Sequence, residues 1–413
     1  MKFRGLAFLG AMAVAMSMAL VEIAAQTPTY TAPRTVWGDP DLQGIWRALD
    51  IMTPMERPLR FGDKAEYTKE EIAKKQKEME DAMKIRCAGG MVMRGYRAQP
   101  NYNALYGCSD DDMSKLVPHR TSAIIDPPNG RLPPWTLEQV KLWEEREKVT
   151  EGHGETDTVL DMDDGGRCFH LLGGGGMGGT NKPLSPEERA RRQAIIDSQK
   201  VVDGGEGFRD DGSTGGPGNN EAGAIRIMQS KGYVAWTHEE GGTYTLVPTD
   251  GRPPLSPKMR QYMGDPRGRW EGNTLVVEYN GRRPKGDPFG RKDTLIIPNF
   301  GIGYIGAGET LHVTQRYTRI GPDTLQVKVT VEDPAVWTRP FTWVREMTRD
   351  DGFKFTQQVC QENTKDLGNS LAHARADEQL SLEYGDTARE DRVKLFEERK
   401  AEAIAEAEKN KKR

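Results

Sequence analysis

A histidine and a carboxylate end the apolar segment that begins at Tyr233, and this pair is the first candidate for chemistry. His238 and Glu239 are adjacent, and residues of these types can transfer protons or bind a metal ion. Adjacent residues of a strand point to opposite faces, so one strand does not direct both at a single substrate. His238 is therefore either a catalytic or ligand residue, or a structural histidine at a strand end. Gly242 stands where a zincin helix would carry its second histidine, and the sequence predicts no metal site.

The segment from Gly264 to Gly272 brings guanidinium groups, carboxylates and an indole together. Its glycines and its proline predict a turn. On such a turn Arg267 and Arg269 could bind a carboxylate or a phosphate, with Trp270 as a stacking wall. Glu271 would then be a candidate for acid–base chemistry. The alternative is a structural network in which the arginines pair with neighbouring carboxylates and Trp270 fills the end of a barrel.

Polar side chains also recur along the strands predicted after residue 310. If they face the interior of a barrel, they would line a site for a small molecule, whereas an outward face would be an ordinary solvated surface. The sequence leaves both possibilities open. His312 and Arg316 are the ligand-binding candidates of this set, and His170, three residues after Arg167, is another. The whole set comprises His312, Arg316, Lys328, Glu332, Arg345 and Gln357.

The four cysteines of the chain suggest disulfides rather than a nucleophile or a metal site. In an oxidising compartment four cysteines favour two bridges, and three pairings are possible. We expect Cys87 to pair with Cys108, and Cys168 to pair with Cys360, which would close a long loop. No Cys-x-x-Cys motif occurs, and the Gly-x-Ser-x-Gly elbow of serine hydrolases is absent as well.

The first residues have the pattern of a secretory signal peptide. Lys2 and Arg4 precede an apolar run over residues 5–20, and Glu22 ends it. The alternative is a membrane anchor, but the run is shorter than the roughly 20 residues that a bilayer span needs. We therefore expect residues 1–25 to be removed, which would leave a periplasmic or secreted protein without a membrane span.

The composition sets limits on the class of protein. The chain has 413 residues, of which 36% are hydrophobic and 29% are charged, and its net charge is -4. These values support a real hydrophobic core and exclude a disordered chain or a multi-span membrane protein. The slightly acidic balance gives no electrostatic basis for a nucleic-acid partner, and we expect none.

The elements before residue 224 are predicted to be extended or helical. Residues 26–223 form an N-terminal region that opens with a mostly extended lead-in over residues 27–60. Capping-box patterns at Thr68 and Thr136, and a similar pattern at Ser185, predict helices to about residues 86, 149 and 198. Two glycine-rich stretches flank the last of these helices. They lack the context of a phosphate-binding loop, so we interpret them as flexible insertions.

From Ala224 the sequence predicts strands. Leu325, Val327, Val329 and Val331 alternate with polar residues, which is typical of a sheet with one wet face. Short strands joined by turns suggest an antiparallel meander over residues 224–362, folded as a lipocalin-like barrel or half-barrel, with a sandwich as the alternative. A short helix is expected from Ser256 to Met263. A charged C-terminal tail, residues 363–413, is expected to form a solvated helix from Thr387 onward, in which only Val393, Leu395, Phe396 and Ile404 could be buried.

Three segments carry a resemblance to a family. They are Asp41-Leu-Gln-Gly-Ile-Trp46, Thr53-Pro-Met-Glu-Arg-Pro58, and the run from Gly264-Asp-Pro-Arg-Gly-Arg-Trp-Glu-Gly to Glu278. They resemble segments of a group of exported bacterial hypothetical proteins without a settled activity. The resemblance implies export and β-architecture, and it extends over most of the chain up to Cys360. The chain departs from the pattern at Gly242 and Gln361, where relatives tend to carry histidines.

These features together lead to one leading hypothesis and two alternatives. We expect an exported protein whose β-domain binds a small, partly apolar molecule. The first alternative is a periplasmic lyase, isomerase or hydrolase that uses His238 with Glu239 or Glu271, and an arginine as the anion holder. The second alternative is a structural envelope protein. The sequence names no cofactor.

Overall fold

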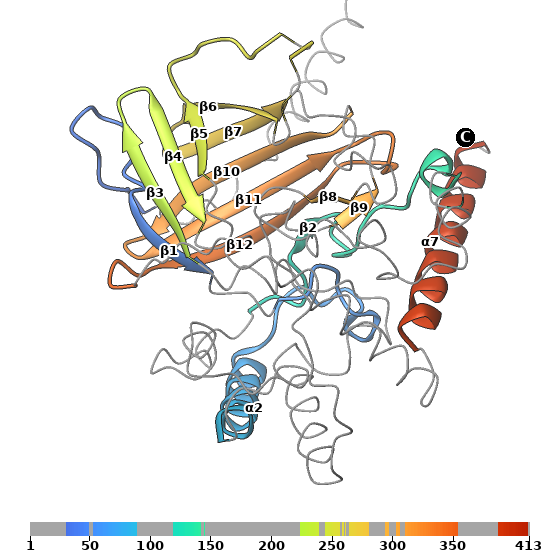
Figure 1. Cartoon of the computed structure of the whole chain (residues 1–413). Coiled ribbons are helices and arrows are strands. Elements are labelled where there is room, and N and C mark those ends of the chain that lie inside the picture. The colour runs from blue at the N-terminus through green and yellow to red at the C-terminus, as the bar shows by residue number, and fades with distance from the viewer. Residues whose placement is uncertain are drawn as a thin grey trace, which may run out of the picture.

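The structure is a computed structural model in which a mainly β body is accompanied by a few helices (Figure 1). Ten strands form one antiparallel, nearly closed barrel-like sheet, which confirms the predicted fold class. The residues that the structure describes are 30–48, 53–88, 119–141, 144, 224–238, 244–256, 258–259, 261, 264–280, 294–296, 303–305, 310–353 and 387–411.

The order of the strands follows the chain around the barrel. The sheet has the order β5-β4-β3-β1-β12-β11-β10-β7-β6, and β2 pairs with β12 beside this path. Neighbours along the path alternate in direction, so the two end strands, β5 and β6, run the same way. The strands are β1 Gly44–Ala48, β2 Ile124–Asp126, β3 Ala224–Ser230, β4 Tyr233–His238, β5 Tyr244–Pro248, β6 Asp265–Glu271, β7 Thr274–Asn280, β10 His312–Gly321, β11 Thr324–Glu332 and β12 Phe341–Arg349, with a separate hairpin of β8 Thr294–Ile296 and β9 Gly303–Ile305.

Strand β1 completes the sheet from the lead-in of the chain. Trp46 is opposite Ile225 of β3 on one side and Arg349 of β12 on the other. This part of the lead-in is extended, as the sequence predicts. It also forms a strand of the sheet, between β3 and β12, the first and last strands of the region after residue 224. The barrel is therefore not confined to residues 224–362.

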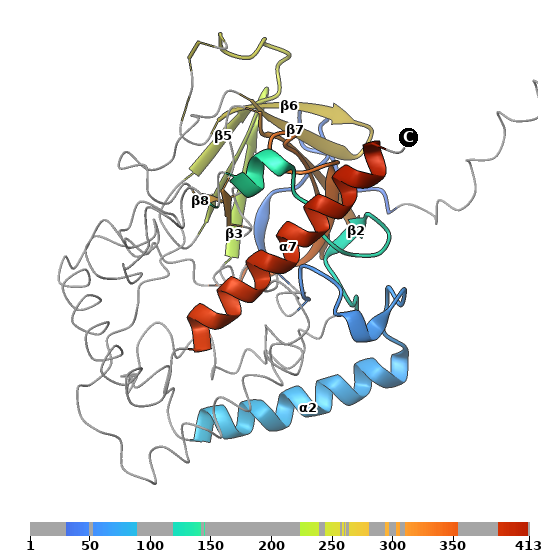
Figure 2. The same cartoon turned by 90° about the vertical axis from the view of Figure 1, so that its right-hand side faces the viewer.

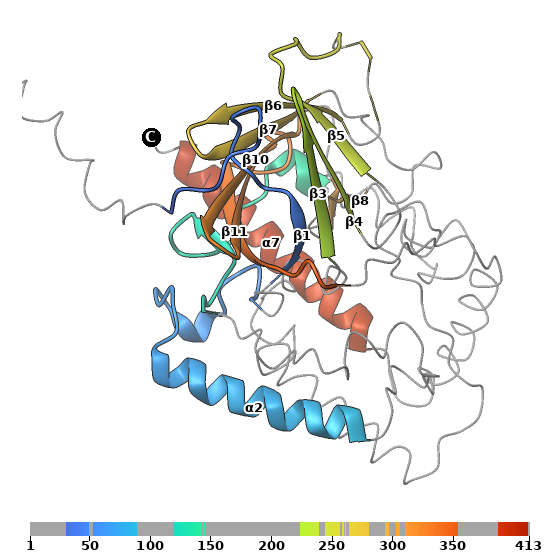
Figure 3. The same cartoon turned by 90° about the vertical axis from the view of Figure 1, so that its left-hand side faces the viewer.

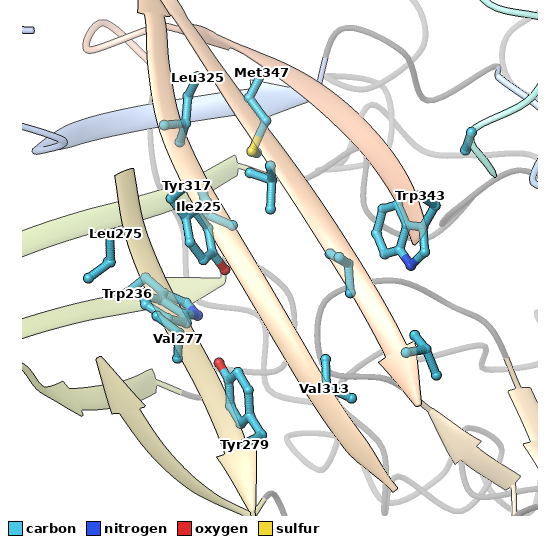
Figure 4. Packing of buried hydrophobic residues seen from close by; sticks show 14 of the residues in the cluster. Ile225, Trp236, Leu275, Val277, Tyr279, Val313, Tyr317, Leu325, Trp343 and Met347 are labelled. Atoms are coloured by element: carbon cyan, nitrogen blue, oxygen red, sulfur yellow. The ribbon is translucent and has the colours of Figure 1, made fainter. Parts of the chain in front are cut away.

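One side of each strand builds the core, and we call this side the inner face. Leu325, Val327, Val329 and Val331 of β11 are completely buried, while their neighbours face the other side. The predicted alternation of β11 is therefore confirmed. Figure 4 shows how residues of the neighbouring strands continue this face. Its members include Ile225, Trp236, Leu275, Val277, Tyr279, Val313, Tyr317, Phe341, Trp343 and Met347.

The seam between β5 and β6 depends on a glycine. A Cβ atom on Gly268 would lie 2.8 Å from side-chain carbons of both Val247 and Thr249, so only glycine allows the two strands to approach this closely. Polar contacts hold the connecting segment against β6. The Asp265 carboxylate accepts a hydrogen bond from the Leu255 N–H at 2.7 Å.

The Asp41–Trp46 motif contributes a buried tryptophan to the core. Trp46 is completely buried and donates from its indole to the Leu42 carbonyl at 2.9 Å. The guanidinium carbons of Arg319 and Arg349 lie 5.6 and 6.0 Å from the centre of its ring. Gly44 has a φ of 131°, which favours glycine.

The first helix begins where the capping box predicts it. Helix α2 spans Lys69–Ala88. The Thr68 N–H donates to Glu71 at 2.7 Å, and the Glu71 N–H donates back to the Thr68 hydroxyl at 3.3 Å. Thr136 caps a second helical segment at residues 137–141 through the Gln139 N–H. The predicted third helix lies outside the described residues.

The C-terminal helix α7, Thr387–Lys411, is packed against the body rather than solvated (Figure 2). The expectation of a solvated helix was wrong, because Ala403 and Arg399 are buried while Ile404 is exposed. Arg399 donates to the buried carboxylate of Glu56, whose other oxygen accepts from the Leu132 N–H at 2.9 Å. Among the described side chains of α7, a small one and a charged one are buried here, and a search for large apolar residues does not find such positions.

Two further local predictions need correction. Residues Gly264–Gly272 do not form a turn: Asp265–Glu271 is strand β6, and the turn follows at Gly272 and Asn273. The antiparallel pairing of this segment with β7 outweighs the preference of its glycines and its proline for a turn. The helix predicted from Ser256 is instead a turn, closed by a hydrogen bond from the Met259 N–H to the Ser256 carbonyl at 2.7 Å.

Several predictions fall outside the described residues. They concern the signal peptide, the glycine-rich stretches, the strand after Phe353, and Gln357. Cys87 is part of α2, and Cys108, Cys168 and Cys360 are not described. Both disulfides therefore stay predictions.

Candidate binding site in the barrel interior

Five strands contribute one residue each to a transverse row on the inner face. In register, Trp270 of β6 pairs with Leu275 of β7, which pairs with Tyr317 of β10; Tyr317 in turn pairs with Val327 of β11, and Val327 with Arg345 of β12. We call these five residues the interior row. It combines apolar walls with an indole, a phenol and a guanidinium.

Trp236 of β4 reaches this row from another part of the barrel. Its ring centre lies 5.2 Å from that of Tyr317, with an interplanar angle of 41°. The Trp236 side chain is 1% exposed, and its indole nitrogen has no hydrogen-bond partner. An indole N–H can only donate, so an acceptor placed beside it would satisfy the group.

Hydroxyl and amide groups lie next to this pair of rings. The Tyr317 hydroxyl donates to Gln315 Oε1 at 2.8 Å, and both residues are buried. Tyr279 is buried on the neighbouring strand β7. In Figure 4 the Trp236 nitrogen and the Tyr317 and Tyr279 hydroxyls turn toward the same part of the interior. Few polar groups on an apolar wall are typical of small-molecule sites.

The structure shows which face of the sheet each described member of the polar set occupies, a question that the sequence left open. His312, Arg316, Lys328 and Glu332 belong to the outer face, because the residues between them on β10 and β11 are the buried ones. Arg345 is different: it is 1% exposed and lies on the inner face, opposite Val327. Grouping Arg345 with the other four was wrong, because the register of β12 shifts it to the opposite side of the sheet.

The outer face of β6, β7 and β10 carries a network of ion pairs. Arg269 pairs with Glu271 at 2.9 Å and with Glu278 at 2.7 Å, and Arg316 pairs with Glu271 at 2.7 Å. Hydrogen bonds from Arg316 and Arg269 lower the pKa of Glu271. The carboxylate of Glu271 is thus held in its ionised form, which does not suit a general acid at neutral pH.

Other candidate residues of the Gly264–Gly272 segment and of the polar set after residue 310 also have partners in the structure. Arg267 pairs with Asp265 at 2.5 Å and donates to the Pro253 carbonyl at 3.1 Å. His312 lies 3.0 Å from Glu332 through its Nδ1 atom. Trp270 is partly buried and packs against the core. Its indole nitrogen is buried without a hydrogen-bond partner.

His238 ends β4 at the register position opposite Ile225, and its side chain is not among those that the structure describes. Glu271 pairs with arginines on the outer face of β6. The predicted pairing of these two residues therefore stays a prediction. Glu239 and His170 lie outside the described residues.

The sequence missed Trp236, Gln315 and Tyr317 as site residues. Strand β10 has polar or aromatic residues on both faces, so hydrophobic alternation does not show which face is inside. The register supplies that information: Gln315 pairs with Val329, and Tyr317 pairs with Val327. The uninterrupted apolar face of β11 was the available signal.

Comparisons with protein-family models, with curated proteins and with solved structures find no match for this chain. Within the described part of the chain, no helix has the length and apolar character needed to cross a membrane. The same residues contain no group of three or more histidines, cysteines, aspartates or glutamates that could hold a metal ion.

Proposed function

We propose that this is an exported protein whose barrel interior binds a small, partly apolar molecule. The observation that carries the proposal is the Trp236 indole, which is completely buried against Tyr317 and has no hydrogen-bond partner. A buried polar group without a partner costs roughly 1–3 kcal/mol. A phenylalanine would fill a purely structural core without this cost, so the indole favours a binding role.

The surroundings of Trp236 support a ligand with an apolar body. Leu275 and Val277 are completely buried on the inner face, and Tyr317 adds an aromatic surface. The Gln315–Tyr317 hydrogen bond fixes a polar group in the same wall. A site of this kind holds its ligand by burial and orients it through a few hydrogen bonds.

The acid–base alternative receives less support from the described residues. Glu271 is engaged by Arg316 and Arg269 on the outer face, and Arg267 is engaged by Asp265. These contacts suit a role in fixing the outer face of the sheet. The His238–Glu239 pair of this alternative lies outside the described side chains.

Native mass spectrometry of the protein purified from a bacterial periplasm tests the binding proposal. We expect a mass excess of a few hundred daltons, typical of a small metabolite, which disappears on denaturation. Trp236→Leu should lower the bound fraction, whereas Trp37→Leu should not, because Trp37 bonds only to Asp39 near the surface. Protein that carries no small molecule, at native folding yield, would contradict the proposal.

The same preparation tests export. N-terminal sequencing of the periplasmic protein should begin near residue 26 if residues 1–25 are removed. A mature protein that still begins at Met1 would contradict the signal-peptide part of the proposal.

A further inference from the structure

We infer that the ligand carries an acceptor oxygen, either a carbonyl or a carboxylate, on a planar apolar body, and that the indole N–H groups of Trp236 and Trp270 recognise that oxygen. The inference rests on the proposed function and adds the chemical class of the ligand. Its basis is a second buried donor: the Trp270 nitrogen, like that of Trp236, has no hydrogen-bond partner.

The two donors restrict the chemistry of the ligand. An indole N–H donates and cannot accept, so the complementary group must be an acceptor such as a carbonyl or carboxylate oxygen. An ammonium group, which only donates, would leave both indoles unsatisfied. One unpartnered indole could be a local imperfection of packing, but two from strands β4 and β6 point to a common function.

The register places both indoles around one part of the inner face. Leu275 lies between Trp270 and Tyr317 in the interior row, and the Tyr317 ring contacts Trp236. The groups between the two donors are therefore an aliphatic side chain and an aromatic ring. Rings of a ligand pack well against such a surface in offset or edge-on geometry, which explains why we expect a planar body.

Arg345 distinguishes the two forms of acceptor. It belongs to the same row and is completely buried, and a guanidinium is a cation whose N–H groups only donate. A carboxylate would gain from this charge in addition to the indole hydrogen bonds, whereas a carbonyl would gain only the hydrogen bonds. The shared feature, an acceptor oxygen, is the inference, and the experiment separates the two forms.

The test uses three naphthalene probes of nearly equal size in equilibrium dialysis with the full mature chain. 2-Naphthoate carries a carboxylate, 2-acetylnaphthalene carries a carbonyl, and 2-ethylnaphthalene carries no acceptor. We expect one or both acceptor probes to bind about 10-fold tighter than 2-ethylnaphthalene, the effect of one or two hydrogen bonds. This comparison needs no variant, so it does not depend on whether a substituted protein folds.

Three variants locate the effect. Trp236→Phe and Trp270→Phe each keep an aromatic ring and remove one donor. Each should weaken the acceptor probes about 5-fold and leave 2-ethylnaphthalene unchanged. Trp37→Phe is the matched control, since its indole bonds to Asp39 at 3.0 Å, outside the barrel, and it should change none of the three affinities.

The outcomes separate the inference from the proposed function. Equal binding of all three probes, with no response to either Phe variant, would overturn the inference and leave binding in the barrel intact. Failure of all three probes to bind would overturn the proposed function as well. Loss of 2-ethylnaphthalene binding in the Trp236→Phe protein would also contradict the inference, because it would assign the ring rather than the N–H the decisive role.

Discussion

At the scale of single residues, burial changes chemistry most clearly at Tyr67. Its ring packs edge-on against Phe61, with 5.4 Å between the ring centres, and the Lys75 ammonium lies 4.7 Å from its centre. Burial raises the pKa of Tyr67 to about 12; the positive charge of Arg60 opposes this shift, and the negative charge of Glu71 adds to it. The phenol therefore stays protonated in the folded protein at pH values where the unfolded chain would lose the proton.

This shift predicts how stability depends on pH. A raised folded-state pKa gives a stabilisation that is complete below the unfolded value near pH 10 and is lost as the pH rises through about 12. The free energy of unfolding of the Tyr67→Phe protein should fall by about 3 kcal/mol less than that of the native protein, from two pKa units at about 1.4 kcal/mol each. Urea unfolding at several pH values measures the difference. Parallel pH profiles of the two proteins would contradict the assignment.

The seam of the barrel gives a second prediction at a single residue. Gly268→Ala would place a methyl group 2.8 Å from carbons of Val247 and Thr249, so we expect a loss of about 1–3 kcal/mol in the free energy of unfolding. Gly321→Ala is the matched control, because its nearest atom outside the adjacent residues would be 3.4 Å away. A Gly268→Ala protein as stable as the control would show that the seam is looser than this geometry implies.

At the scale of elements, local sequence signals predicted where helices and strands begin and end, but they predicted less well what those elements contact. The capping box at Thr68 and the alternation in β11 are short-range patterns, and both are confirmed. The Gly264–Gly272 segment misled because its glycines and proline resemble a turn, while the pairing with β7 makes it a strand. Figure 3 shows β6 and β7 next to β10 in the sheet.

Helix α7 illustrates a contact that no local pattern encodes. Glu56 and Arg399 are separated by most of the chain, yet both are buried where α7 meets the segment before residue 60. An Arg399→Met variant would leave the Glu56 carboxylate buried without this cation, and we expect a loss of about 3–5 kcal/mol in the free energy of unfolding.

Two further variants serve as controls for this prediction. Lys400→Met removes a half-exposed ion pair with Glu144 and should cost less than about 1 kcal/mol. The double variant Glu56→Gln with Arg399→Met removes both charges and should recover part of the loss. The urea midpoints of the three variants measure these losses in the free energy of unfolding. Equal losses in Arg399→Met and Lys400→Met would mean that burial of the Glu56–Arg399 pair is unimportant.

At the scale of the whole molecule, the barrel depends on strands that are far apart in the chain. Strand β1 lies between β3 and β12 and makes register contacts with both. A fragment of residues 224–362 lacks this strand and the buried Trp46, so we expect it to unfold without a cooperative transition, unlike the full mature chain. Thermal unfolding followed by circular dichroism measures this. A fragment that unfolds at the same midpoint as the full chain would establish an independent β-domain.

The sequence by itself determined the period of each strand and the local ends of helices, because these depend on neighbouring residues through backbone geometry and capping. It therefore predicted a β-barrel with flanking helices. Only the tertiary structure decided which face of β10 is inside, that β1 joins the sheet, and that Trp236 contacts Tyr317. The physical reason is that strand register and burial arise from partners far apart in the chain, and the pattern of a single strand does not identify those partners.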